Sequence, residues 1–243
     1  MICDKNKVLS HASNRVHTFR ILSPMRYVLS AFWIVLYAWT ADAGVVPYVG
    51  AIGGIATLSA DAGSRATAQS LALSGYSPSN GGALNVFAGL HLHNYVSVQG
   101  DYMWNENELE LSSTSSASNT FYRQRRNSSQ QAAVFDFLVY FRPRQSRIRP
   151  YLATGVGWMH LVSREEALLG SHGNPILPPD RFSANRAVFR SHVGIDLRIY
   201  RRLDFRYSFS ESISNNDISQ HLSPPAPRRL ANFQNLFGFV VRF

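Results

Sequence analysis

A two-residue alternation of apolar and polar side chains constrains the fold of this chain more than any other feature. It is clearest in residues 203–210, where every odd position holds Leu, Phe or Tyr and every even position holds a charged residue or Ser. Side chains two positions apart lie on the same face of a β-strand, whereas a helix would mix the two sets. We therefore predict a strand with one apolar face and one charged face.

Eight segments with such alternation follow one another, joined by connections that are short and long in turn. The mean hydropathy of −0.12 excludes a bundle of transmembrane helices. Segments of about ten alternating residues, even in number, are typical of a transmembrane barrel. The fold class predicted is all-β, an eight-stranded antiparallel up-and-down transmembrane β-barrel. The predicted strands are 47–57, 84–93, 95–105, 134–142, 151–161, 186–199, 203–210 and 232–243, and the four long extracellular loops are 58–82, 106–130, 163–184 and 211–230.

The N-terminal region contains one apolar run, residues 27–39, which is shorter than the roughly 20 residues that a membrane-spanning helix needs. Arg26 precedes it, and the small-x-small sequence Ala-Asp-Ala follows at residues 41–43. We expect residues 25–43 to be a signal peptide and residues 44–243 to be the barrel domain. Residues 1–24 are then a disordered tail or a misassigned start. The alternative for the apolar run is a permanent single-helix anchor.

Cleavage at this point would remove the only cysteine, Cys3, and the only two lysines, and would leave 19 arginines against 13 acidic residues, a formal charge of +6. The sequence pI near 10.0 would suit a nucleic-acid partner. The arginines are scattered over strands and connections, however, and export separates the protein from nucleic acid. We therefore expect no nucleic-acid partner.

The polar faces of the predicted strands point into the barrel. In lipid every backbone polar group must be paired, so the sheet must close, and eight strands leave an interior just wide enough for side chains. Buried charges persist only when they are paired, so we predict a structural plug of ion pairs. The alternative is a narrow ion-conducting path. The predicted lumen network is Gln99, Asp101, Asp136, Tyr140, Arg186, Arg190, His192, Asp196, Arg198, Asp204 and Arg206.

Two segments carry a family resemblance. Residues 149–158, Arg-Pro-Tyr followed by Gly155-Val-Gly157, resemble a segment common in small outer-membrane barrels of the OmpA/OmpX-like superfamily. Residues 237–243 resemble the last strand of those barrels. The resemblance implies a location in the bacterial outer membrane and an assembly signal, recognised by the barrel-assembly machinery, at Phe239, Val241 and Phe243.

Enzymatic and metal sites receive little support from the sequence. Lipid A 3-O-deacylases carry a His-x-Ser-Asn element, and the nearest match here is Ser-Ile-Ser-Asn at residues 212–215, in which Ser212 replaces the histidine. Without a neighbouring base the Ser214 hydroxyl is not activated, and spacing does not support His221 in that role. His91 and His93 lack a third metal ligand at a diagnostic spacing. We expect no catalytic residue, metal or cofactor.

The function that these observations favour is a structural, surface-binding or adhesion role carried by the four extracellular loops. The alternatives are a narrow porin-like channel and a lipid A-modifying enzyme. Arg123, Arg125 and Arg126 are candidates for contact with lipopolysaccharide phosphates, because guanidinium groups fit phosphate geometry; the alternative is a solvated loop end. We expect a monomer surrounded by outer-membrane lipids and lipopolysaccharide, with any extracellular ligand at the loops.

Overall fold

The computed structural model describes residues 44–59, 64–67, 70–225 and 229–243, and the side chains of residues 64–67 and 70 are not described. The expected signal peptide (25–43) and the segment before it (1–24) lie outside the described residues. No helix in the described part of the chain is long and apolar enough to cross a membrane. The elements are β1 (Val46–Ser59), β2 (Ser64–Thr67), β3 (Ser70–Pro78), β4 (Asn80–His91), β5 (Val96–Ser115), β6 (Thr120–Tyr140), β7 (Ile148–His172), β8 (Arg181–Tyr200), β9 (Leu203–Asn215), α2 (Asp217–Gln220) and β10 (Arg229–Arg242).

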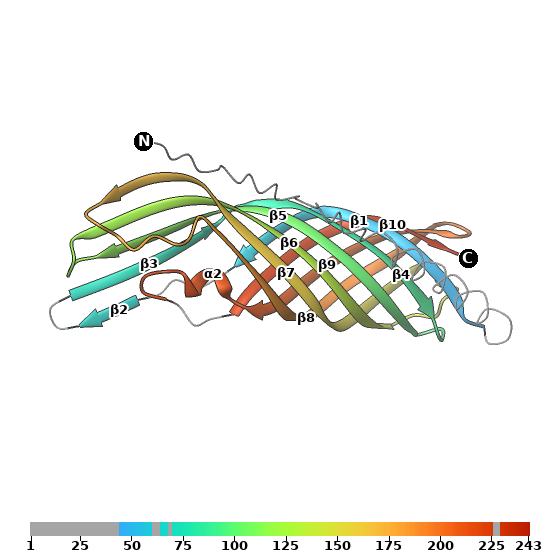
Figure 1. Ribbon diagram of the computed structural model, residues 1–243. Helices are drawn as coiled ribbons and strands as arrows, with labels where there is room; N and C mark the ends of the chain where they lie inside the picture. The colour runs from blue at the N-terminus through green and yellow to red at the C-terminus, as the bar shows by residue number, and fades with distance from the viewer. Residues whose placement is uncertain (1–43, 60–63, 68–69, 226–228) are drawn as a thin grey trace, which may run out of the picture. The chain divides into compact units, whose positions relative to one another are not determined.

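Eight of the strands form a closed antiparallel ring in the order β1, β4, β5, β6, β7, β8, β9, β10. The last strand pairs with the first, with Tyr48 opposite Arg242, so the ring has no free edge at this level. Figure 1 shows the strands inclined to one another around the ring. The predicted eight-stranded antiparallel barrel is confirmed.

The strands extend well beyond their predicted ends on one side of the barrel, which corrects the four long loops. β5 and β6 pair as far as Ser115 and Thr120, so only residues 116–119 connect them. β7 runs on to His172 beside β6, and β3 pairs with the outer part of β5. In Figure 1, β3, β5, β6 and β7 project past the ends of β8 and β9. We call this sheet, formed by β2, β3 and the outer parts of β5, β6 and β7, the extracellular extension.

The extension falls in segments predicted as loops, because these segments lack the outward apolar face by which the eight strands are recognised. On β5 the alternation in fact continues there with its polarity reversed. On β5, Tyr102 faces outward and Asp101 is buried, whereas ten residues further along Leu109 and Leu111 are buried and Glu110 lies on the outer face. The period of two persists while the surrounding solvent changes from lipid to water, so the charged and apolar faces exchange sides.

The lipid-facing wall can be followed along β6. Its outward positions from Phe135 to Phe141 are apolar and 39 to 66 % exposed. The outward position Gln131, two residues beyond Ala133 toward the extension, is polar and exposed. The apolar wall therefore ends near Ala133 on the extracellular side and near Phe141 at the tight turns.

Candidate functional site

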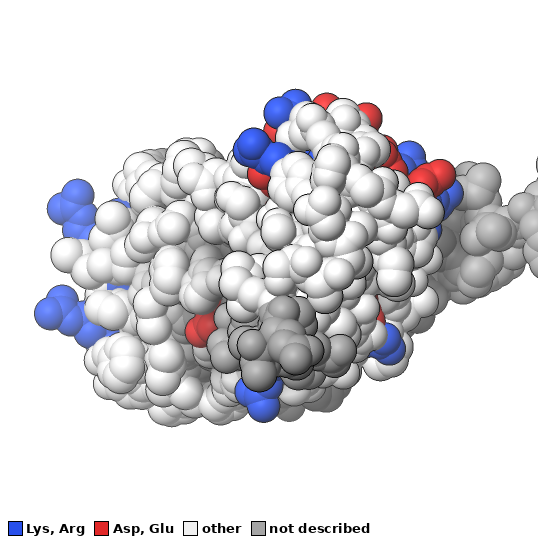
Figure 2. All heavy atoms as spheres, turned by 90° about the vertical axis from the view of Figure 1, so that its left-hand side faces the viewer, with Lys and Arg blue, Asp and Glu red and all other residues white. Residues whose placement is uncertain are grey.

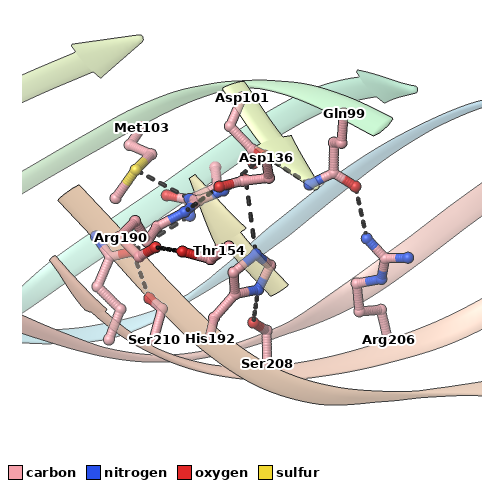
Figure 3. Close-up of polar contacts among 12 residues, drawn as sticks. Gln99, Asp101, Met103, Asp136, Thr154, Arg190, His192, Arg206, Ser208 and Ser210 are labelled. Atoms are coloured by element: carbon pink, nitrogen blue, oxygen red, sulfur yellow. Dashed lines mark hydrogen bonds and ion pairs between the residues drawn. The ribbon is translucent and has the colours of Figure 1, made fainter. Parts of the chain in front are cut away.

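The first charged centre of the lumen is built around Arg190 on β8 (Figure 3). Its Nη2 donates to Asp101 Oδ2 at 2.7 Å, and the same guanidinium donates to both oxygens of Asp136. His192 Nε2 lies 3.6 Å from Asp136 Oδ2, and His192 Nδ1 lies 3.3 Å from Ser208 Oγ. All of these side chains are buried, so one arginine is shared by two aspartates that are out of contact with water.

The second centre is built around Arg206 on β9. Its Nε and Nη2 donate to the two oxygens of Asp196 at 2.6 and 2.8 Å, a bidentate ion pair. Nη2 also donates to the Tyr140 hydroxyl at 2.9 Å, and Nη1 donates to Gln99 Oε1 at 2.8 Å. Gln99 in turn donates to Asp101 at 2.5 Å, so a single amide joins the two centres (Figure 3).

The structure brings most of the predicted lumen residues into this interior, and places two at its ends. Arg198 lies at the periplasmic end, where Nη1 donates to the Gln145 carbonyl at 3.0 Å. Arg186 lies at the extracellular mouth, where it forms a bidentate ion pair with Asp217 of α2. The buried members are Gln99, Asp101, Asp136, Tyr140, Arg190, His192, Asp196, Asp204 and Arg206.

Two buried arginines of the lumen were missed from the sequence. Arg242 Nη2 donates to Asp204 Oδ1 at 2.9 Å, and its Nε lies 2.8 Å from Oδ2 of the same ion pair. The guanidinium of Arg149 lies 3.8 Å from the centroid of the Tyr140 ring. Arg242 occupies a polar position of the alternating last strand and could have been found by extending the same rule. Arg149 was missed because the predicted strand began two residues later.

The predicted lipopolysaccharide cluster is divided between the two faces of β6. Arg123 lies on the outer face and pairs with Glu110 at 2.5 Å, and Arg125 lies on the same outer face. Arg126 is fully buried on the inner face, where its Nε donates to Ser163 Oγ at 3.0 Å. Alternation along the strand requires this separation, so Arg126 is removed from the candidate surface.

Charge in the interior is balanced by number. The described residues include five buried arginines and five buried aspartates. An unpaired buried charge is costly, and an ion pair inside a barrel is tolerated only with good geometry and additional hydrogen bonds. Arg190, Arg206 and Arg242 pair with four of these aspartates, and Asp217 pairs with the partly exposed Arg186. Within the described residues Arg126 and Arg149 have no ion pair, so the interior is balanced in number but not pair by pair. The residues are Arg126, Arg149, Arg190, Arg206 and Arg242, with Asp101, Asp136, Asp196, Asp204 and Asp217.

Uncharged amide side chains fill the next layer toward the extracellular side. Asn232 Nδ2 donates to Asn105 Oδ1 and to Gln130 Oε1, both at 2.9 Å. Asn85 Nδ2 donates to Gln234 Oε1 at 3.2 Å. These side chains are buried, so polar groups occupy the cross-section between the charged centres and the extracellular mouth.

An apolar cluster fills the extracellular mouth, with the buried polar side chains of Gln124 and Arg126 beside it on β6, opposite Leu111 and Leu109. Ile218 and Leu222, from α2 and the turn that follows it, are fully buried and pack with Leu109, Leu111 and Leu161 of the wall. We call residues 216–222 the cap segment. Its Asn216 side chain accepts a hydrogen bond from the Ser219 amide at 2.9 Å, which caps α2. The cap segment was missed because it lies in a predicted loop without periodicity.

His221 ends the cap segment next to Phe182, with the ring centroids 4.5 Å apart. Partial burial, followed by the nearby charge of Arg126, lowers the pKa of the His221 imidazole. Ser214 Oγ is buried and donates to the Asn215 carbonyl at 3.4 Å. In the described part of the chain, no hydrogen bond joins His221 to Ser214.

The two histidines weighed as metal ligands lie in different surroundings. His91 is buried with Nδ1 2.5 Å from Ser97 Oγ, whereas His93 is exposed in the turn before β5. Among the described residues, no group of three His, Cys, Asp or Glu side chains is placed to hold a metal ion.

The outer face of the barrel carries a basic pair that the sequence did not reveal. Arg164 on β7 and Arg181 on β8 are directly opposite each other, and both are exposed. Neither has an ion-pair partner among the described residues. Like charges in such positions repel, and no acidic side chain in the described part of the chain forms an ion pair with either arginine. Figure 2 looks onto the end of the barrel that carries the extension, where most of the surface is uncharged, side chains of both signs gather at the top of the view, and separate basic side chains lie at the left and lower edges.

A closed ring of eight antiparallel strands, with an apolar outer wall and a charged interior, defines an integral β-barrel protein of the bacterial outer membrane. The chain belongs to the outer membrane protein beta-barrel domain family, whose sequence profile it matches over residues 28–223. It therefore lies in the outer membrane of a Gram-negative bacterium, as predicted. No curated protein sequence matches the chain.

Solved structures of small outer-membrane proteins are similar to this chain at low identity. Neisserial surface protein A matches with 16% identity and a TM-score of 0.45, covering 82% of this chain and 99% of its own. OprG from Pseudomonas aeruginosa matches with 12% identity and a TM-score of 0.48, covering 82% and 96%. Ail of Yersinia pestis, solved with the heparin analogue sucrose octasulfate, matches with 12% identity and a TM-score of 0.37, covering 82% and 97%.

Proposed function

We propose that this protein is a non-conducting surface-binding barrel, whose activity resides on the extracellular extension rather than in the lumen. The observation that carries the proposal is the sequence of layers inside the barrel: charged, then amide, then apolar. The side chains of Ile218 and Leu222 are at most 3 % exposed at the mouth, so an ion would have to cross an apolar seal. The narrow pore is therefore the weaker candidate.

The extension supports binding because it is rigid and charged on its outer face. Paired strands hold its side chains in fixed positions, unlike the flexible loops expected from the sequence. Arg125 and Arg164 on the extension, and Arg181 at the adjacent end of β8, are exposed without an ion-pair partner among the described residues. We propose that these arginines contact phosphates of the lipopolysaccharide saccharide, in place of the predicted set that included Arg126.

The height of these arginines fits a saccharide better than a lipid headgroup at the wall's edge. Arg164 lies six residues beyond Trp158 along β7, which corresponds to about 20 Å of strand at roughly 3.4 Å per residue. A strand inclined by about 45° would then raise Arg164 by roughly 14 Å above Trp158. Phosphorylated sugars beyond the headgroup layer are the anions expected at that height.

A lipid A-modifying activity has weaker support. Ser214 is buried, and its hydroxyl contacts a backbone carbonyl rather than a base. A nucleophilic serine needs an adjacent base and access to its substrate. We propose no catalytic role for this protein.

Two measurements on the purified, folded protein test the proposal. In a planar bilayer we expect no steady conductance, and a stable open level would contradict the sealed lumen. In a binding assay with lipopolysaccharide, the double variant Arg164→Ala/Arg181→Ala should bind at least roughly tenfold more weakly, since hydrogen bonds to charged groups contribute about 1.5–3 kcal/mol each. The matched control is Arg201→Ala, in the exposed periplasmic turn. Equal binding by both variants would contradict the assigned surface.

A further inference from the structure

The outer wall of the barrel contains a groove that is separate from the lumen and from the extension. It has a volume of about 880 Å³ and crosses the wall from β1 to β7. Gly100 on β5 lies in it and faces outward, between the buried side chains of Gln99 and Asp101. The groove is therefore a depression on the lipid-facing side.

Register explains the depression. Val49, Ala88, Gly100 and Phe135 are successive cross-strand partners on β1, β4, β5 and β6. Neighbouring strands are about 4.8 Å apart, so roughly 14 Å of wall between Val49 and Phe135 carries only a methyl group and a hydrogen atom. The larger side chains on either side form the walls of the groove.

The space over Gly100 is not filled by the protein itself. A phenylalanine opposite a glycine can fold over it and shield the backbone. Here a Cβ placed on Gly100 would meet no atom within 4 Å, and Phe135 is 58 % exposed. The Phe135 ring therefore stands beside the gap and leaves it open to the membrane.

The depth of the groove identifies the leaflet. On β6, Phe135 is the second of five outward apolar positions counted from the extracellular side, Ala133 being the first. The pair formed by Gln131 and His160, one outward position beyond Ala133 and Trp158, is polar and exposed. The groove thus lies within the outer-leaflet half of the wall. Lipopolysaccharide forms that leaflet in Gram-negative bacteria.

We propose that this groove binds one acyl chain of lipopolysaccharide, with Gly100 and Ala88 as its floor and Tyr102 and Trp158 on its rim. An acyl chain is the group that reaches this depth, and the exposed lining is predominantly apolar. The site is independent of the saccharide contacts proposed above, because it involves none of those arginines. Because the chain is already in hydrocarbon, its gain on seating there is van der Waals contact with the wall over a gap that the protein leaves open.

The test uses native mass spectrometry of the protein extracted from outer membranes in mild detergent. Gly100→Phe should fill the groove without a clash, because the space above Gly100 is open. Gly82→Phe is the matched control: a Cβ on Gly82 also meets nothing within 4 Å, and Gly82 does not line the groove. Ala133→Phe, which narrows the groove from β6, is a second groove variant. Heat-modifiable migration on a gel checks that each variant is folded.

We expect wild type and Gly82→Phe to retain a bound lipopolysaccharide molecule, and both groove variants to retain it about tenfold less often. Equal retention by all variants would overturn the proposal. Selective retention of phospholipid would overturn the assignment to lipopolysaccharide. A dimer that is present in wild type and lost in Gly100→Phe would show that a second copy of the chain occupies the groove instead.

Discussion

Arg190 on β8 and Asp101 on β5 form a hydrogen-bonded ion pair at 2.7 Å across the lumen, although β6 and β7 separate their strands in the ring. The pair therefore joins parts of the wall that no backbone hydrogen bond connects. Asp136 on β6 shares the same guanidinium. Removing the arginine would leave two carboxylates buried without a cation.

We expect Arg190→Met to lower the free energy of unfolding by about 3–5 kcal/mol, the usual effect of breaking a buried pair from one side. Urea unfolding in lipid vesicles measures this quantity. Adding Asp101→Asn and Asp136→Asn to the same variant should recover part of the loss, because the unpaired charges are then removed. Arg201→Met, in the exposed turn, is the control and should be neutral within about 0.5 kcal/mol. Equal stability of Arg190→Met and Arg201→Met would contradict the pairing.

The reversal of polarity along β5 makes a second prediction, which is tested by three arginine substitutions on β5 and its neighbour β6. Leu109→Arg places a charge in the apolar layer and should lower the free energy of unfolding by about 3–5 kcal/mol. Phe137→Arg places a charge on the lipid face, where the expected loss is about 2–4 kcal/mol. Glu108→Arg changes an exposed outer position of the extension and should be close to neutral.

Unfolding measurements on these three variants distinguish the extension from a flexible loop. If residues 106–111 were an unstructured connection, Leu109→Arg would be as harmless as Glu108→Arg. That result would also remove the apolar seal on which the non-conducting lumen rests.

The cap segment supplies a third prediction. Ile218→Ala and Leu222→Ala each remove buried apolar volume, which costs roughly 2 kcal/mol or more. Because the segment is short and peripheral, the loss should appear as local opening rather than global unfolding. When protease is added to intact cells, cleavage within residues 216–222 should then be about thirtyfold faster for each 2 kcal/mol by which the free energy of local opening falls. Ile176→Ala, at a side chain that is 79 % exposed in the neighbouring connection, is the control. Unchanged cleavage in all three variants would contradict a cap held by its apolar contacts.

The sequence was sufficient to predict the strands of the fold wherever one face of a strand lies against lipid. There the two-residue rule located all eight ring strands. The same alternation is enough to predict that Asp196 and Arg206 face inward. The same rule placed Arg186 in the lumen, but it could not show that its partner would be Asp217 in a distant connection. Pairing across the barrel depends on register and closure, which a single strand's pattern does not contain.

The extension was missed for a different physical reason. Glu106, Glu108 and Glu110 alternate with residues that the structure buries, but they occupy the outward positions that the rule for lipid-facing strands expects to be apolar. A strand leaving the membrane keeps its period and exchanges its faces, so a search for alternation of either polarity would have found it. The cap segment and the groove at Gly100 have no such signal. The groove depends on which short side chains become neighbours across strands, and the cap segment depends on which apolar side chains line the mouth after the ring closes.

The final prediction concerns Phe243, the terminal aromatic residue proposed as part of the assembly signal. Its backbone amide donates to the Pro47 carbonyl at 3.0 Å, which completes the ladder between the last and first strands, while its ring is 58 % exposed to the outside. Phe243→Ala keeps the backbone bond and removes only the ring. If the barrel-assembly machinery recognises the ring, the amount of folded protein in the outer membrane should fall several-fold. Refolding of the purified variant into detergent should proceed as in wild type.

Phe141→Ala is the matched control, because Phe141 is also an outward aromatic at the periplasmic end and is 66 % exposed. Both variants lose a similar contact with lipid, so any effect of lipid anchoring is common to them. A decrease in folded protein that is specific to Phe243→Ala therefore measures recognition during assembly. Equal decreases in the two variants would instead assign the terminal aromatic to anchoring at the membrane interface.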